Sequence, residues 1–207
     1  MKANKISNFL TGTKILEERK SKFNGNLRVV KALGMGTYIQ ANGLTQSGGI
    51  VESIWRSVLK KLRAEEIKSV LILGLGGGTV AKLVKEHWPG AKITGVDIDP
   101  IMVELGTKYL ALDAGSVKTV ITDAYSFNSV GYDLVIVDLY NGDEFPKKFE
   151  EDGFLKKLTR NKLIVFNRLY YGDKRPMAVR FGLKLQKVFK KVKYYYPEAN
   201  LMFICSG

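Results

Sequence analysis

The stretch that decides the fold is VLILGLGGGTVAKLV, residues 70–84. It begins with an unbroken apolar run, continues with glycine at four of the next five positions, and ends with apolar residues at helical spacing. A buried strand, a glycine turn and a helix in this order are typical of an α/β unit. Because glycine has no Cβ, such a turn lets another group come close to its backbone. The sequence therefore predicts a ligand beside this turn.

From residue 70 onward, strands and helices alternate. Strands are predicted at 70–73, 92–96, 118–121, 134–137, 162–166, 193–196 and 201–205, and helices at 79–88, 100–110, 146–158 and 177–188. Alternation requires crossover connections, and strands that are apolar throughout are buried on both faces. The expected fold is α/β, with a doubly wound, mostly parallel sheet of seven strands and an antiparallel pair at one edge.

Residues 1–48 differ from this pattern. Short extended segments there are separated by Asn-Gly and Gly-Met-Gly turns, which predicts a small β-meander. A helix is expected next, because Ile50, Ile54, Val58 and Leu62 recur at helical spacing. We therefore expect an N-terminal β-meander over 1–48 and an α/β domain over 49–207.

The composition, 45% apolar and 26% charged, is that of an ordinary globular protein. No apolar run is long enough to cross a bilayer and the first residues lack a secretory apolar core, so the default expectation is a cytoplasmic protein without membrane segments. Cys205 is the single cysteine, which excludes a disulfide framework within this sequence. It lies in an apolar run and is expected to be buried. His87 is the only histidine, and no spacing typical of metal ligands occurs, so no metal is expected.

The formal net charge of +13 bears on possible partners. A basic surface attracts nucleic acid, acidic lipids or acidic substrates, and it also keeps a protein soluble. The lysines are scattered along the sequence, which weakens the prediction of a dedicated nucleic-acid groove. The same charge repels a cationic polyamine, although a local acidic pocket can override the average field.

The glycine spacing narrows the choice of ligand. Gly74, Gly76 and Gly78 stand two residues apart, whereas the dinucleotide fingerprint has its third glycine one position later, where this chain has Thr79. The spacing disfavours an NAD-dependent dehydrogenase and fits the tighter form used by proteins that bind S-adenosylmethionine. A tight strand-to-helix turn without a ligand is the alternative.

Acidic residues follow the next two strands. Asp97, 19 residues past Gly78, is placed to accept protons from both ribose hydroxyls. Asp99 is expected to cap the helix that begins at Pro100. Asp123 is a candidate acceptor for an adenine amino group, or alternatively a turn aspartate. The carboxyl ends of these strands meet at one edge of the sheet, so the side chains are expected to converge on one crevice.

Taken together, these motifs resemble the spermidine synthase family, the aminopropyltransferases built on the Rossmann-like S-adenosylmethionine methyltransferase fold. The N-terminal stretch, with Gln46-Ser47 at its close, is similar to that family's β-meander, and the glycine turn, VDIDP, DAYSF and YDLVIVDLYNGDEFP follow in the family's order. The resemblance implies S-adenosylmethionine or its decarboxylated form as the bound compound, without a metal. The residues that it implies as contacts are Gln46, Gly74, Gly76, Gly77, Gly78, Asp97, Ile98, Asp123 and Ala124.

The sequence also departs from the family's pattern. Gly77 stands where catalytic members usually have aspartate, and Trp55, Arg56 and Ser57 stand where they have a Tyr-His-Glu or Tyr-Gln-Glu triplet. In the family's acid-Ser-Ser-acid-Pro stretch, only the first acid, Asp138, is retained. The acceptor side is therefore expected to differ, with Trp55, Arg56, Tyr140 and Asn141 as candidate substrate contacts. A positive charge at Arg56 would oppose a cationic diamine.

Three functions remain open from the sequence. Both reactions of this fold displace a group at a carbon bonded to a sulfonium, so the protein mainly aligns the reactants, and Asp138 is the candidate catalytic base for an amine acceptor. Asp138 as a turn residue and Tyr140 as a packing residue are the alternatives. The leading hypothesis is alkyl transfer, most simply methyl transfer, to an unknown small-molecule acceptor. Aminopropyl transfer and a non-catalytic nucleoside- or nucleic-acid-binding role are the others. The resemblance and an open meander edge hint at a homodimer.

Overall fold

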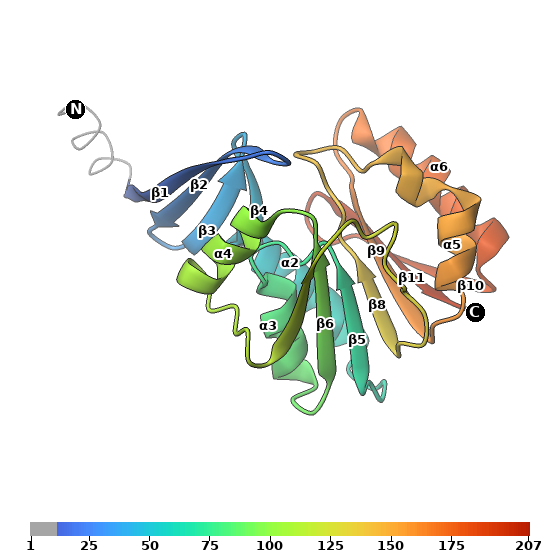
Figure 1. The fold of residues 1–207 in the computed structure, drawn as a ribbon. Helices are drawn as coiled ribbons and strands as arrows, with labels where there is room; N and C mark the ends of the chain where they lie inside the picture. Colours follow the sequence, from blue (N-terminus) through green and yellow to red (C-terminus); the bar gives the residue numbers. More distant parts are fainter. Residues whose placement is uncertain (1–11) are drawn as a thin grey trace.

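The computed structural model describes residues 12–207, and two β-sheets organise this part of the chain (Figure 1). Residues 1–11, which include the start of the predicted meander and most of the stretch used to judge secretion, lie outside the described residues. Within 12–207, no helix has the length and apolar character needed to cross a membrane.

The first sheet is the predicted meander. Its four antiparallel strands, β1 (Thr13–Ser21), β2 (Gly25–Ala32), β3 (Gly36–Ala41) and β4 (Leu44–Gly48), pair in chain order. Buried side chains of β2 and β3 share a core with Met102 and Leu105 of α4 (Pro100–Tyr109). The sheet ends at Gly48 and α2 (Ile50–Lys61) follows it directly. The division of the chain at residue 48 into two domains stays a prediction.

The second sheet has seven strands in the order β10-β11-β9-β8-β5-β6-β7, which confirms the expected fold class. Its parallel strands are β5 (Ser69–Leu73), β6 (Lys92–Asp97), β7 (Val117–Ile121), β8 (Leu134–Val137) and β9 (Leu163–Leu169). The strands β10 (Lys191–Tyr195) and β11 (Asn200–Ser206) form the antiparallel pair at one edge. Cys205 is buried in β11, and burial raises the pKa of its thiol.

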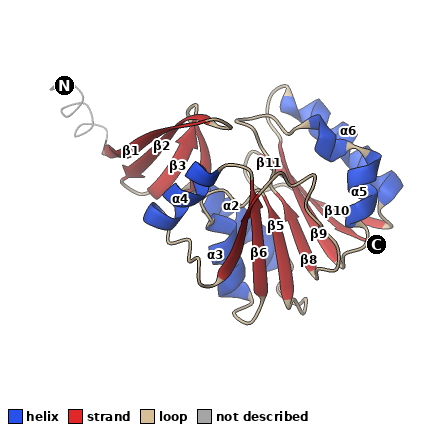
Figure 2. Cartoon of the chain, in the orientation of Figure 1, coloured by secondary structure: helices blue, strands red, loops and turns tan. Residues whose placement is uncertain are grey.

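Helices flank the seven-stranded sheet (Figure 2), and successive side chains of the central strands enter two separate cores, one on each face of the sheet. Val70 and Ile72 pack with α2 and α3 (Thr79–His87), whereas Leu71 and Leu73 pack with α5 (Asp152–Leu158) and α6 (Lys174–Val188). A strand buried on both faces has no room for polar alternation, which explains the continuous apolar runs in the sequence.

Two predicted helices have different bounds in the structure. The helix expected over 146–158 is a short 3-10 helix, η1 (Lys147–Glu150), followed by α5, because Glu151 between them is extended. The helix expected from 177 begins at Lys174, since Pro176 is compatible with a first helical turn. The strand order reverses between β5 and β8, and this is where ligands bind in doubly wound sheets.

Candidate functional site

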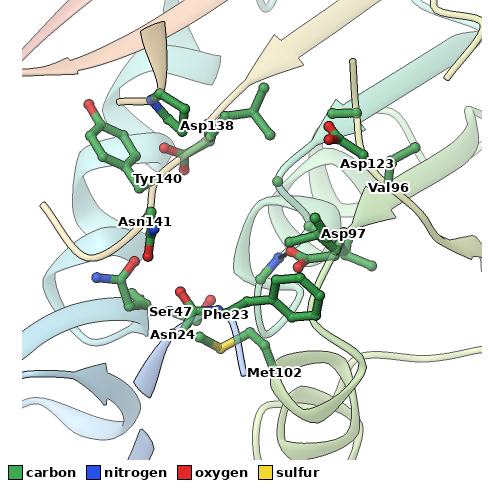
Figure 3. A pocket seen from close by; sticks show the side chains of 18 of the residues that line it. Phe23, Asn24, Ser47, Val96, Asp97, Met102, Asp123, Asp138, Tyr140 and Asn141 are labelled. Atoms are coloured by element: carbon green, nitrogen blue, oxygen red, sulfur yellow. Dashed lines mark hydrogen bonds between the residues drawn. The ribbon is translucent and has the colours of Figure 1, made fainter. Parts of the chain in front are cut away.

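A cavity of about 390 Å³ opens at the carboxyl ends of β5, β6 and β8 (Figure 3). Its walls come from the β1–β2 hairpin tip, the end of β4, the glycine turn and the loops after β6, β7 and β8. The predicted contacts that line it are Gln46, Gly74, Gly76, Asp97, Ile98, Asp123, Ala124, Asp138, Tyr140 and Asn141. The fold therefore brings most of the predicted site residues to one place.

The glycine turn has two parts with different roles. Gly74 and Gly76 line the cavity, and both have positive φ, at 89° and 56°. A Cβ at Gly74 would lie 2.1 Å from the main-chain oxygen of Asp138, and one at Gly76 would lie 2.8 Å from Ser47 Oγ. Neither position tolerates a side chain, because the protein's own atoms already occupy the place of the Cβ.

Gly77 and Gly78 lie away from the cavity lining and serve packing, which differs from the expected role as ligand contacts. A Cβ at Gly78 would lie 2.6 Å from Leu112, and one at Gly77 would lie 2.8 Å from Leu110 and 2.9 Å from Ile39. The Gly77 amide donates to Ser47 Oγ at 2.7 Å. These glycines let the meander and the end of α4 pack against the turn.

Asp97 ends β6, and main-chain amides fix its carboxylate. Oδ2 accepts from the Gly76 amide at 2.7 Å, and Oδ1 accepts from the Asp99 amide at 2.9 Å. Burial raises the pKa of Asp97, and these amide hydrogen bonds oppose the rise. Each oxygen retains acceptor capacity toward the cavity, which is what a pair of ribose hydroxyls requires.

Asp99 caps α4, as the sequence predicts, and also holds the meander. Its Oδ1 accepts from the amides of Ile101 and Met102, while Oδ2 accepts from Ser21 Oγ and Asn24 Nδ2. These bonds hold the β1–β2 hairpin tip, so that residues 22–24 line the cavity. Sequence reasoning missed this wall, because no local pattern shows that a hairpin tip reaches a helix 75 residues later.

Asp123 follows β7 and forms an ion pair with Lys148, a second lining residue that sequence reasoning missed. Its Oδ1 also accepts from the Tyr125 amide at 2.9 Å, so the turn role and the cavity role occur together. Burial pushes the pKa of Asp123 upward, but the Lys148 ion pair and the Tyr125 amide outweigh it and leave the pKa below its usual value.

Asp138 lies at the tip of β8, and two neutral donors hold its carboxylate. Trp55 Nε1 donates to Oδ2 at 2.9 Å, and Asn167 Nδ2 donates to Oδ1 at 2.8 Å. Asn200 Nδ2 in turn donates to Asn167 Oδ1 at 2.7 Å, so a chain of buried amides supports the carboxylate. Burial raises the pKa of Asp138, and the Asn167 and Trp55 hydrogen bonds oppose the rise. Trp55 itself is fully buried, so it orients Asp138 from behind the cavity wall.

The loop after β8 forms the wall beside Asp138. The Tyr140 hydroxyl donates to the Asn167 main-chain oxygen at 3.1 Å and accepts from the Leu169 amide at 2.9 Å. Burial raises the pKa of this hydroxyl, and both hydrogen bonds commit it to the fold. Asn141 bridges to Glu144, and Gln46 Nε2 donates to the Gly142 oxygen at 3.2 Å. Gln46 thereby joins the meander to this loop.

Arg56 is outside the cavity, so the structure does not bring it together with the other predicted site residues. Its guanidinium donates to Glu86 of α3 at 2.7 Å and to Glu52, one helical turn earlier, at 2.8 Å. These carboxylates draw the side chain onto the solvent face shared by α2 and α3.

Another arginine, which the sequence did not single out, supports the site. Arg168 of β9 is almost fully buried, donates to Glu150 of η1 at 2.6 Å, and lies 4.3 Å from the Phe145 ring centroid. It anchors the segment that brings Lys148 and Phe149 to the cavity. Across residues 12–207, no three His, Cys, Asp or Glu side chains gather in a way that could hold a metal ion.

Sequence comparisons find relatives of this chain among two kinds of transferase. Over 139 residues, which are 61% of this chain and 46% of the relative, the chain is 31% identical to a polyamine aminopropyltransferase of Sulfurisphaera tokodaii. Over 163 residues, 70% of this chain and 23% of the relative, it is 26% identical to the mouse eEF1A lysine and N-terminal methyltransferase. The matched region thus spans less than half the length of either relative.

The fold has solved counterparts as well. The crystal structure of spermidine synthase from Thermotoga maritima has a TM-score of 0.72, at 16% identity, and the match covers 93% of this chain and 72% of that one. A model described as the spermine/spermidine synthase domain matches residues 52–196. Since this match covers most of the chain, the protein belongs to the spermine/spermidine synthase domain family.

Proposed function

We propose that the cavity binds an adenosyl sulfonium donor, S-adenosylmethionine or a close relative, and that the protein transfers an alkyl group, most simply methyl, to a small-molecule acceptor. The observation that carries the proposal is the meeting of Asp97, Asp123 and Asp138, from three strand ends, around one cavity. Its volume lies within the range of small-molecule sites. The relatives named as aminopropyltransferase and methyltransferase support transferase chemistry.

The donor half of the cavity comprises Gly74, Gly76, Asp97, Asp123 and their neighbours. Asp97 would accept the ribose hydroxyls, since its two oxygens are oriented by the amides of Gly76 and Asp99. Asp123 would accept the adenine amino group, with Ile98 and Ala124 beside it. The donor set therefore fits the group: acidic acceptors for hydroxyl and amino protons, beside a turn without side chains.

The acceptor half comprises Asp138, Tyr140, Asn141 and Gln46. The donor would supply an electrophilic carbon bonded to a positively charged sulfur. Asp138 would orient the acceptor amine and take up its proton, and the burial that raises the Asp138 pKa makes the carboxylate a better base. Trp55 and Asn167 hold the carboxylate in one orientation, so the alignment of the reactants does not depend on a mobile side chain.

The charges of the cavity favour methyl transfer over aminopropyl transfer. In the part of the chain that the structure describes, Asp138 is the one carboxylate of the acceptor half, and its neighbours Gln46, Tyr140 and Asn141 are neutral. A diamine has two cationic groups, whereas a single carboxylate matches one amine. Aminopropyl transfer from the decarboxylated donor remains the second candidate, because the family and the S. tokodaii relative favour it.

The test ranks the donors and then searches for turnover. Isothermal titration calorimetry with S-adenosylmethionine, its decarboxylated form and methylthioadenosine is expected to give the highest affinity for S-adenosylmethionine. Tighter binding of the decarboxylated form would reverse the order of the two candidates, and no binding of any adenosyl compound would refute the proposal. Methyl-labelled donor is then offered with a panel of monoamines and diamines. Donor binding without turnover would favour the non-catalytic nucleoside-binding role. A cytoplasmic location and a homodimer stay predictions.

A further inference from the structure

The positive charge of this protein is concentrated in its C-terminal part. Residues 174–197 contain eight Lys and Arg residues and no Asp or Glu, so they supply eight of the thirteen net positive charges. This segment forms α6 and β10. The two elements lie at the end of the molecule away from the N-terminal sheet (Figure 1). The scatter of lysines along the sequence therefore conceals an uneven distribution in space.

Most of these cations have no carboxylate partner. Lys174 pairs with Asp143 and Lys184 pairs with Asp152. Among the described residues, no ion pair involves the six others, which are all exposed: Arg175, Arg180, Lys187, Lys190, Lys191 and Lys193. Unpaired cations that are close together repel one another, so such a cluster costs stability unless an anion neutralises it.

A third element, α2, adds a lysine on the face of the sheet opposite α6. Strand β10 is the edge strand of the seven-stranded sheet and pairs only with β11. From α2, the Lys61 ammonium lies 5.1 Å from the ring centroid of Tyr195 in β10. We call the surface formed by Lys61, Lys187, Lys190, Lys191 and Lys193 the basic edge.

Exposed aromatic rings follow the lysines along residues 191–196, at positions that alternate with them, so the two kinds of side chain emerge on opposite faces of the edge strand. Tyr194 is 37% exposed and Tyr196 is 56% exposed. The Tyr194 ring packs edge-on against Phe203, with the ring centroids 5.2 Å apart, and Tyr196 packs edge-on against Tyr170, with the ring centroids 5.3 Å apart. Each ring is thus supported by a neighbouring ring while keeping exposed surface, which is the arrangement that lets a planar base stack on an aromatic side chain.

We propose that the basic edge, together with Tyr194 and Tyr196, binds single-stranded nucleic acid. Lysines that follow an open strand edge contact successive phosphates, and exposed tyrosines on the same strand supply stacking platforms that tolerate any base. Lysine on an edge strand also prevents strand pairing between molecules. That role explains cations on the strand itself, but not the paired tyrosines or the lysine contributed by α2. The surface is separate from the cavity, and the proposal stands whether or not the protein is a transferase.

The test measures binding of a fluorescein-labelled 20-nucleotide oligo(U) RNA, and of the matching oligo(dT), by fluorescence anisotropy between 50 and 200 mM KCl. We expect the triple variant K190E/K191E/K193E to weaken binding by at least about tenfold and to reduce the salt slope by about two, since each phosphate contact contributes about 0.7 on a single strand. The variant Tyr196→Ala should weaken binding severalfold with an unchanged salt slope, because stacking releases no counterions.

The matched control is K85E/K92E/K118E, which makes the same change in net charge on exposed positions of α3, β6 and β7, toward the opposite edge of the sheet. Its affinity should stay within about threefold of wild type. Equal losses in the two triple variants would show attraction by net charge alone and overturn the proposal. Binding to vesicles with 30% anionic lipid but not to either oligonucleotide would also overturn it, as would no binding at 50 mM KCl. If K190E/K191E/K193E melts below wild type, the Gln triple at the same positions replaces it.

Discussion

The two halves of the cavity are built in different ways. In the donor half, the partners of Asp97 are the amides of Gly76 and Asp99, which belong to the turns that follow β5 and β6. In the acceptor half, the partners of Asp138 are the side chains of Trp55 and Asn167, which lie 83 and 29 residues away along the chain. The donor half therefore uses main chain that any sequence with this turn provides, whereas the acceptor half depends on particular side chains.

The difference teaches which half is free to change. The proposed ribose contact, formed by main-chain amides and the Asp97 carboxylate, constrains few residues, so a family can keep it while its members act on different acceptors. Side chains that converge from α2, β8 and β9 can be exchanged singly, and each exchange alters the environment of Asp138. The following predictions test this division, from the largest expected effect to the smallest.

Asp138→Asn should separate the halves most clearly. We expect turnover to fall about 10²- to 10⁴-fold, the range of a lost general base, while donor affinity by calorimetry stays within about threefold. A parallel loss of donor binding would place Asp138 in the donor half and contradict the division.

The same variant has a predicted effect on the pH dependence of stability. Burial raises the folded-state pKa of Asp138 above the ordinary value of 3.8. The Asp138 carboxyl group therefore keeps its proton to higher pH in the native protein than in the unfolded chain. Wild type should therefore gain stability relative to Asp138→Asn as pH falls from 7 toward 4, in urea unfolding followed by circular dichroism. A difference that is constant with pH would contradict the raised pKa.

Asp97→Ala should weaken donor binding by at least about 100-fold, since two hydrogen bonds to a charged group are lost and each contributes about 1.5–3 kcal/mol. Asp123→Asn is the matched comparison in the same half. This variant should lose less donor affinity than Asp97→Ala, because Lys148 already neutralises the Asp123 carboxylate. Unchanged calorimetric affinity in the Asp97 variant would mean that the ribose is held elsewhere.

Gly78→Ala should lower stability by about 1–3 kcal/mol through positive φ and overpacking, because the new Cβ would meet Leu112 at 2.6 Å. Donor affinity of the folded fraction should stay within about threefold, since Gly78 contacts Leu112 and does not line the cavity. A large affinity loss at full stability would return Gly78 to the donor contacts.

Asn167→Leu should shift the pH profile of kcat/KM rather than abolish activity. The Asn167 hydrogen bond lowers the pKa of Asp138, so its removal lets that pKa rise further. The active form is the carboxylate, and the acidic limb should therefore move to higher pH. Asn200→Leu, which acts through Asn167, should give a smaller shift in the same direction. A fall in kcat/KM by the same factor at every pH would indicate that Asn167 has only a structural role.

The same division explains how much the sequence could predict. The succession of strands and helices along the chain, the glycine turn and the acids at the strand ends follow from local patterns, and Asp97, Asp99 and Asp123 lie where those patterns place them. Arg56 lies outside the cavity because the direction of its side chain depends on Glu86, 30 residues away on α3. Lys148, Arg168 and the hairpin tip were missed because nothing near them in the chain indicates their partners. The sequence did not show that Gly77 and Gly78 pack against other parts of the chain, because a bare backbone can admit neighbouring side chains as well as a ligand.

Asp99 has a consequence for any attempt to exchange parts between members of this family. One of its oxygens accepts from the first amides of α4 and the other accepts from Ser21 and Asn24, so this one carboxylate joins the tip of the β1–β2 hairpin to the start of α4. The family match begins at residue 52, after the meander. A chimera with a foreign meander would thus have to carry serine and asparagine at the matching hairpin positions. Without these two residues, one oxygen of the buried Asp99 carboxylate would lose its hydrogen-bond donors, and the hairpin tip would no longer be held against the cavity.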